Sequence, residues 1–411
     1  MNEILNENCN PFDKIPEEND FPPPLPEVYE AEIAALNKKI SDLKEHIDKK
    51  NTLDPQNPFE NPAEYHHYNS DYTKIVPQVA FPGCKIPIEP NLTERKKIRR
   101  FYNIAGINLI LSLFVGGILM QVLYTVAKHI TAAMNPDATP DTILNYLNGS
   151  SLLVAVNMVG FLFCHMFFGW LGLKMAKTKP RELVRTRDFG AVRGIQYCSI
   201  AMFLQIIAII MMLGVTQYMA GFGLRDWDVS GMFDYNLPTG KLLSAIYGCI
   251  IAPVCEEFFY RGMLLKNLSK ANQRFAIFMT AVLFGLGHHN IAQFSLGFVI
   301  GIFLAHITIK HNSIIPAIIV HMFNNSMSYL YSEFHDINKY PNASSLLDLA
   351  FTVLPIIGFI MFIDFRLKSK LPNATHQQDR RGISLALTSV PFFLALFAHI
   401  AYTAFIIVRS S

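Results

Sequence analysis

The sequence predicts an all-α fold: a polytopic bundle of transmembrane helices with a soluble N-terminal extension. Two observations carry this prediction. Hydrophobic residues make up 51% of the 411-residue chain and charged residues only 16%, against roughly 25% charged residues in soluble domains. Apolar runs near the ~20 residues that a bilayer requires recur from residue 102 onward. We therefore expect a transmembrane domain over 99–411 and a soluble extension over 1–98.

The extension carries two recognisable patterns. The segment 22–26 is proline-rich and predicts a stiff spacer, and a heptad helix is predicted over 28–50 because apolar residues alternate at spacings of four and three. These apolar residues are Tyr29, Ile33, Leu36, Ile40, Leu43 and Ile47. Through 29–47 the helix could pair with a second copy or a partner helix. It could equally lie as a single amphipathic helix on the protein or the membrane. Residues 51–90 show no period and predict an extended linker.

Composition and local charge exclude several other classes. The six cysteines form no close CxxC pair, so neither a disulfide framework nor a zinc finger is indicated. The first residues are acidic and proline-rich, without the apolar core of a signal peptide. Basic residues at 95–100 directly precede the first apolar run, a position that favours anionic lipids of the cytoplasmic leaflet. We expect the lipid bilayer, and no nucleic acid, as the partner of this cluster.

From residue 102 onward we expect about nine spans, each near the length that crosses a bilayer. They are 102–127, 150–173, 194–220, 242–265, 274–290, 292–309, 313–331, 346–365 and 383–408. The two runs between 274 and 309 are short, and could be broken or re-entrant helices.

Loop charges predict the orientation of these spans. Lys and Arg gather in the loops 174–193, 266–274 and 366–381, and the intervening loops are poor in both. By the positive-inside rule this alternation places the N-terminus in the cytoplasm and the C-terminus outside. We expect a multi-pass protein of the plasma membrane.

One apolar run contains charges that spanning alone does not require. Glu256, Glu257 and Arg261 lie within 242–265, where each charge costs about 2.5–3.5 kcal/mol on insertion scales. Glu257 and Arg261 are four residues apart on a helix and can neutralise each other. Glu256 points roughly 100° away and has no local partner, which makes it a candidate functional residue. The alternative is a structural Glu–Arg pair, with Glu256 reaching the interface.

Three later polar residues fall at a similar depth in their spans. Counted from the cytoplasmic ends, Glu256 lies at ~15 Å, His321 at ~12 Å and His288 at ~21 Å, and Asn325 follows His321 by one turn. A carboxylate and an imidazole can deprotonate a water, and a second imidazole with an amide can stabilise an oxyanion. Two His and one Glu could instead hold a metal ion such as zinc, although no HExxH is present.

These motifs resemble a known family. The pattern EExxxR at 256–261, followed by FxxxH at 284–288 and HxxxN at 321–325, is similar to that of the CAAX protease and bacteriocin-processing (CPBP) family of intramembrane proteases. Glycines at 297 and 301 and the turn at 312–316 also resemble that family. The resemblance covers about 242–331.

The resemblance implies an intramembrane endopeptidase that acts on membrane-associated or lipidated polypeptides. Glu256 would activate water and His288 would orient it, His321 and Asn325 would stabilise the oxyanion, and Glu257 with Arg261 would support the site. The family has been described both as metalloproteases and as glutamate-dependent proteases. The roles that the resemblance implies are CAAX-type processing or bacteriocin-related maturation and immunity.

Two other functions are compatible with buried charges. A transporter would use Glu, His and Arg along an ion pathway and predicts inverted repeats, which we do not find. A non-catalytic scaffold or immunity protein would recruit a partner through the heptads and would tolerate Glu256→Gln. We favour a protease whose site opens toward the cytoplasm.

Overall fold

The computed structural model describes residues 33–42, 91–186, 189–226, 238–269, 272–368 and 386–410. The chain divides into two compact units, Met1–Asp54 with Asp71–Pro90 and Pro55–Ser70 with Asn91–Ser411.

The described part of the first unit is a helix over 33–42, inside the predicted heptad segment. Its apolar residues Ile33, Leu36 and Ile40 are exposed. The rest of the heptad segment, the proline-rich segment and the linker 51–90 lie outside the described residues. Pairing through 29–47 therefore stays a prediction.

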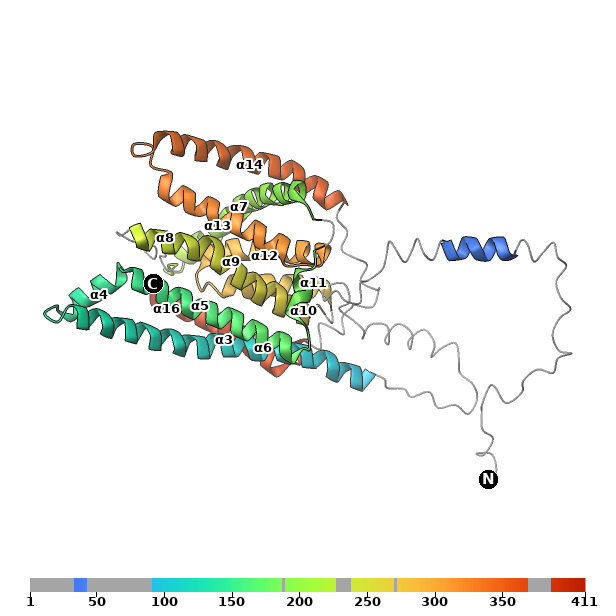
Figure 1. Ribbon diagram of the computed structural model, residues 1–411, viewed down its shortest axis with the longest axis horizontal. Coiled ribbons are helices and arrows are strands. Elements are labelled where there is room, and N and C mark those ends of the chain that lie inside the picture. The colour runs from blue at the N-terminus through green and yellow to red at the C-terminus, as the bar shows by residue number, and fades with distance from the viewer. Residues whose placement is uncertain are drawn as a thin grey trace, which may run out of the picture. The chain divides into compact units, whose positions relative to one another are not determined.

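The second unit is built from helices, and no strand occurs among the described residues (Figure 1). Its elements are α3 (Asn91–Met134), α4 (Pro140–Asn148), α5 (Ser151–Leu162), η2 (Phe163–Phe167), α6 (Phe168–Met175), η3 (Pro180–Val184), α7 (Ala191–Ala220), α8 (Pro238–Ile246), η5 (Tyr247–Ile251), α9 (Ala252–Glu256), η6 (Glu257–Leu265), α10 (Lys266–Leu268), α11 (Gln273–Leu286), α12 (Ile291–His311), α13 (Ile315–Phe334), α14 (Pro341–Lys368) and α16 (Val390–Ser410).

Seven helical stretches of the described residues are long and apolar enough to cross a membrane. They are Arg99–Met134, Ser151–Met175, Ala191–Ala220, Pro238–Leu268, Ile291–His311, Pro341–Lys368 and Val390–Arg409. The predicted polytopic helical bundle is confirmed.

The other two expected spans differ from the seven. Helix α13 has 20 residues, but the polar side chains of its cavity-facing side make it less apolar. Helix α11 has 14 residues, or about 21 Å of helix, which is shorter than the ~30 Å hydrocarbon core. The expected run 274–290 therefore ends as a helix at Leu286, and its last residues form a turn inside the bundle.

Basic loops meet at one end of this unit. The Arg100 guanidinium donates to the Met175 carbonyl (3.3 Å), and the Ile314 amide donates to the Leu183 carbonyl (2.9 Å). The start of α3, the loop after α6 and the turn after α12 are thereby neighbours. This is the grouping that the loop charges predict.

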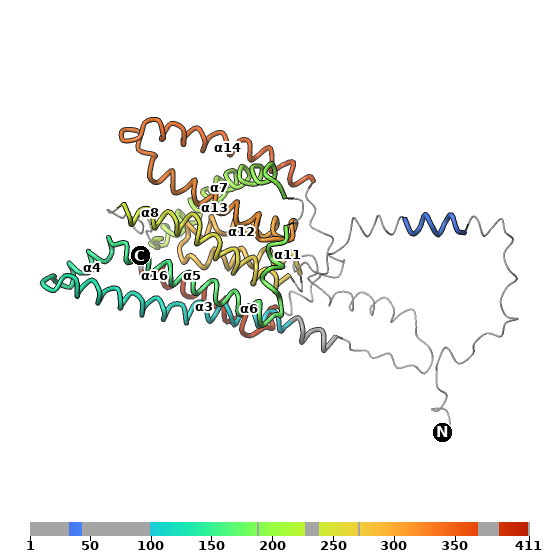
Figure 2. The backbone as a smooth tube through the Cα atoms, in the orientation of Figure 1, coloured from blue at the N-terminus to red at the C-terminus, as the bar shows by residue number. Residues whose placement is uncertain are grey.

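Close helix pairs position the site. Helices α3 and α16 run side by side, as do α7 and α14 (Figure 2), while α11 and α12 form a hairpin. Gly297 faces the Gly285 backbone, and Gly301 faces Ala281, at distances that leave no room for a larger side chain without movement. Small residues here allow the close approach that brings the turn between α11 and α12 to the centre of the bundle.

Candidate active site

The two carboxylates of the sequence motif lie on a helix with unusually wide turns. Residues Tyr247–Ile251 and Glu257–Leu265 are π-helical, and such turns recur at functional sites. Pro253 lies between them and cannot donate a backbone hydrogen bond. The irregular backbone still lets Arg261 reach Glu257, because its Nη1 donates to Glu257 Oε1 at 2.8 Å. The predicted pair is confirmed, and both side chains have no exposed surface.

One oxygen atom of Glu257 accepts hydrogen bonds from two helices. Besides Arg261, its Oε1 accepts from His321 Nδ1 on α13 at 2.8 Å. The guanidinium also donates to the Gly301 carbonyl on α12 (3.4 Å) and lies 4.3 Å from the Phe284 ring centroid on α11. Glu257 and Arg261 thus hold α11, α12 and α13 against this helix.

Glu256 lies on the other side and meets both motif histidines. Its Oε2 is 3.5 Å from His321 Nε2, and its Oε1 is 3.9 Å from His288 Nε2. These distances are longer than direct hydrogen bonds, so the three groups surround a small space. The fold therefore brings together residues that are 65 positions apart along the chain.

Hydrogen bonds fix the histidine tautomers at this space. A carboxylate and a backbone carbonyl accept only, so His321 Nδ1 carries hydrogen toward Glu257. His288 Nδ1 likewise donates to the Phe284 carbonyl at 2.9 Å. Both Nε2 atoms of the neutral rings then present lone pairs to the Glu256 carboxylate. Two carboxylates against one guanidinium leave one negative charge, and a single proton among Glu256, His288 and His321 neutralises the cluster.

The turn that carries His288 is held from several directions. Asn290 caps α12 by accepting from the Gln293 amide (2.8 Å), and its own Nδ2 donates to the His288 carbonyl (3.0 Å). The Asp226 carboxylate accepts from the Ile291 amide (2.9 Å). A side chain at Gly287 would meet Tyr260 Oη. The position of the imidazole is therefore determined by its surroundings.

His289 adjoins His288 but points elsewhere. It has a left-handed backbone with φ of 58°, and its Nδ1 is 3.3 Å from Thr403 Oγ1 on α16. Its ring also lies edge-on to Tyr402. His289 packs against α16 and does not line the cavity.

Asn325 lines the cavity and links two helices, since its Nδ2 donates to the Gly248 carbonyl at 2.9 Å. Asn324, which was not among the predicted site residues, lines the cavity as well. The spacing of three from His321 is the signal that identifies it, because positions i+3 and i+4 both neighbour position i.

A cavity of about 650 Å³ leads away from the site. Glu256, His288 and His321 form its inner wall, and Ser332 and Glu333 line it at the last turn of α13. That turn lies at the end of the unit opposite the basic loops (Figure 1). The cavity thus extends from the site toward the end opposite the basic loops (Figure 1), and the expected opening toward the cytoplasm stays a prediction. Sequence spacing places the residues by depth, and depth does not determine toward which end the cavity extends.

A metal ion is the other chemistry that the sequence left open. Among the described residues, no group of three or more His, Cys, Asp or Glu side chains is arranged to hold one. We derive no catalytic step through a metal.

Comparison with protein-family models gives a match over the segment that carries the site. Residues 238–327 match the model "Rce1-like: Type II CAAX prenyl endopeptidase Rce1-like". The predicted resemblance is confirmed. The Rce1-like segment contains all six motif residues, and the match indicates an intramembrane protease. Comparisons with curated proteins and with solved structures gave no match.

Proposed function

We propose that the protein is an intramembrane endopeptidase that hydrolyses membrane-associated or lipidated polypeptides with Glu256 as the general base. One observation carries the proposal: the carboxylate of Glu256 faces the Nε2 atoms of His321 and His288 at 3.5 and 3.9 Å, at the inner end of a cavity.

The gap between Glu256 and His288 suits the attacking water. A water there donates one hydrogen to the carboxylate and the other to His288 Nε2, and keeps a lone pair for the scissile carbonyl carbon. Glu256 takes the first proton as the C–O bond forms. Because the Nδ1 of His288 is bonded to the Phe284 carbonyl, its ring keeps the orientation that this water requires.

The tetrahedral intermediate carries its negative charge on the former carbonyl oxygen. In this proposal His321, as the imidazolium that balances the cluster, and Asn325 donate to that oxygen. Glu256 then returns its proton to the leaving nitrogen, and the C–N bond breaks to give a carboxylic acid and an amine. Glu257 and Arg261 keep His321 in place and compensate its charge.

The cavity and the family match together suggest which substrates to test first. A cavity within a bundle fits a peptide held in or at the bilayer, and the family description makes a prenylated CAAX peptide the first substrate to test. Bacteriocin-related maturation or immunity is the second class. We place the protein in the plasma membrane with a cytoplasmic N-terminus, on the basis of the loop charges.

Purified protein in detergent tests the proposal with a farnesylated CAAX peptide and a set of membrane-anchored peptides, read by mass spectrometry. Glu256→Gln should lower kcat by about 10²–10⁴-fold, the usual contribution of a general base, and His288→Ala should also lose activity. The matched controls Glu182→Gln and His129→Ala, which do not line the cavity, should cleave like wild type.

A chelator separates glutamate chemistry from zinc chemistry. Glutamate chemistry predicts that turnover survives chelation, whereas loss of turnover that zinc restores would favour a metalloprotease. Turnover that survives Glu256→Gln would contradict the mechanism. A folded wild type that cuts none of the peptides would favour the non-catalytic scaffold.

A further inference from the structure

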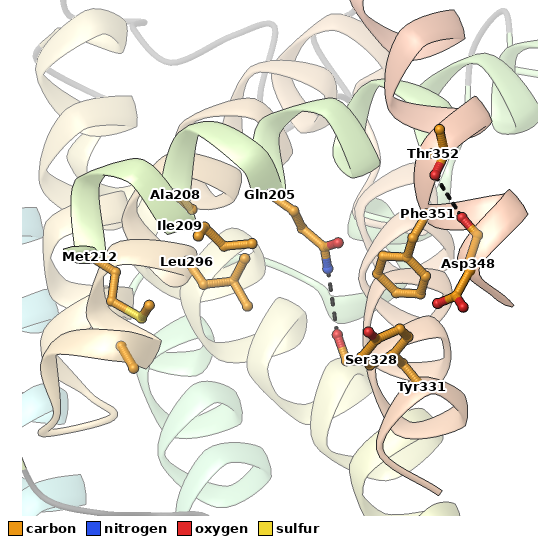
Figure 3. A pocket seen from close by; sticks show the side chains of 11 residues that line it. Gln205, Ala208, Ile209, Met212, Leu296, Ser328, Tyr331, Asp348, Phe351 and Thr352 are labelled. Carbon is orange, nitrogen blue, oxygen red and sulfur yellow. Dashed lines mark hydrogen bonds between the residues drawn. The ribbon is translucent and has the colours of Figure 1, made fainter. Parts of the chain in front are cut away.

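The site cavity has a neighbour on the other side of a thin wall. A second cavity of about 720 Å³ lies among α7, α12, α13 and α14 (Figure 3). Leu296 and Ser328 line both cavities, Gln205 lines only the second, and Asn324 lines only the first. Gln205 and Asn324 therefore meet inside the wall between them.

The contact between them fixes the Asn324 side chain. Gln205 Nε2 donates to Asn324 Oδ1 at 2.7 Å, and also to Ser328 Oγ at 3.4 Å, which Figure 3 shows. Both residues are buried, with 7% and 3% of their surfaces exposed. With its oxygen turned toward α7, Asn324 keeps its NH₂ group for other acceptors.

The Asn324 NH₂ group has no acceptor among the described residues. Its nitrogen is not among the fully buried polar atoms that lack a hydrogen-bond partner. The nitrogen therefore remains in contact with the cavity that the side chain lines. An amide N–H group gains most when it has an acceptor, and an oxygen atom in the cavity can accept the hydrogens of Asn324 Nδ2.

The position of Asn324 on α13 places its NH₂ group on the side of the helix that faces Glu256. Asn324 follows His321 by three residues and so occupies the same side of the helix, where His321 faces Glu256. Asn325 already gives a hydrogen to the Gly248 carbonyl, whereas both hydrogens of Asn324 are uncommitted. Donors that are fixed before the reaction stabilise a developing oxyanion most effectively.

We propose that Asn324 is a further catalytic residue, which donates to the oxyanion of the tetrahedral intermediate, and that Gln205 is its positioning residue. The inference rests on the proposed function. In it, Gln205 of α7 affects catalysis although α7 lies outside the Rce1-like segment.

Steady-state kinetics of variants on a cleaved peptide tests this assignment. Asn324→Ala should lower kcat by about 10²-fold, the usual effect of removing one oxyanion donor, with KM within about 3-fold of wild type. Asn324→Asp keeps the size of the side chain and replaces the donor with an acceptor, so it should lose at least as much. This second variant keeps the test valid if the alanine variant does not fold.

Gln205→Ala should lower kcat by less, about 3- to 10-fold, because Asn324 is then present but not held. In the Asn324→Ala background, the Gln205 substitution should cause no further loss, which is the coupling expected of residues that act as one unit. A merely structural Gln205 would lower kcat in both backgrounds. Ser199→Ala is the matched control, because this buried α7 hydroxyl donates only to the Ile195 carbonyl of its own helix.

Two results would overturn the inference while leaving the proposed function intact. One is an Asn324→Ala enzyme with wild-type kcat when Glu256→Gln is inactive. The other is an effect of Asn324→Ala confined to KM, which would assign the residue to substrate binding. If Glu256→Gln retains full turnover, the proposed function itself fails, and the inference fails with it.

Discussion

Glu256 and Glu257 are adjacent in the chain but belong to two different regions. On the anchor side, Glu257 bonds to Arg261 and His321 at 2.8 Å with no exposed surface. On the cavity side, the nearest nitrogen partner that Glu256 has among the described residues is His321 Nε2 at 3.5 Å. Glu257 is therefore held by protein donors through its Oε1 atom, and this contact joins helices of the fold. A carboxylate whose partners stay just out of reach is available for chemistry.

The largest expected effect comes from removing the buried ion pair on the anchor side, which consists of Glu257 and Arg261. Arg261→Met leaves Glu257 as an uncompensated buried charge, and breaking such a pair costs about 3–5 kcal/mol. Thermal unfolding in detergent should show a strongly destabilised protein. The control is Lys241→Met, which removes the partner of Glu333 in a pair with 44% and 26% exposed side chains and should cost at most about 1 kcal/mol. Equal effects of the two substitutions would remove the distinction between buried and exposed pairs.

A smaller effect is expected where the two regions meet at the turn before His288. Gly287→Ala adds a methyl group against Tyr260 Oη, and overpacking of this kind costs about 1–3 kcal/mol. Activity should fall as His288 moves. Tyr260→Phe removes the hydroxyl, so the double variant should recover stability and turnover. If Tyr260→Phe does not restore Gly287→Ala, the turn is held by other contacts.

On the cavity side the expected change in stability is smaller still. Glu256→Gln removes a charge to which the protein gives no close donor, so the unfolding temperature should not fall although turnover is lost. The measurement uses the same thermal unfolding as for Arg261→Met. A destabilised Glu256→Gln protein would place Glu256 on the anchor side as well.

The last substitution should not change stability. It tests which side of the membrane the end of the cavity at Ser332 faces. Ser332→Cys places a thiol in the last turn of α13, where the cavity ends. If the basic loops face the cytoplasm, a membrane-impermeant maleimide should label this thiol from outside intact cells, read against the same variant in a background that lacks other reactive cysteines. Labelling only after the membrane is opened would reverse the orientation.

Sequence reasoning reached the helical class and the Glu257–Arg261 pair, because the first depends on the apolar runs and the second on spacing along one helix. It did not reach the direction in which the cavity extends, because depth along each span does not determine which helix ends line it. Nor did it reach the contact of Gln205 with Asn324, since α7 and α13 are joined by no motif. Six motif residues lie within one segment, but the surroundings of each come from the whole bundle.

The short helix α11 has a consequence for how a protease supplies itself with water. Its 14 residues stop about 9 Å short of a full hydrocarbon crossing. The remaining depth is occupied by a polar turn rather than by lipid-facing helix. Hydrolysis consumes one water per bond cut, and we expect the cavity that His288 of this turn lines to supply that water to Glu256 without a path through the bilayer. In a thicker bilayer, kcat should therefore fall because less water reaches the site, and KM for the substrate should change less.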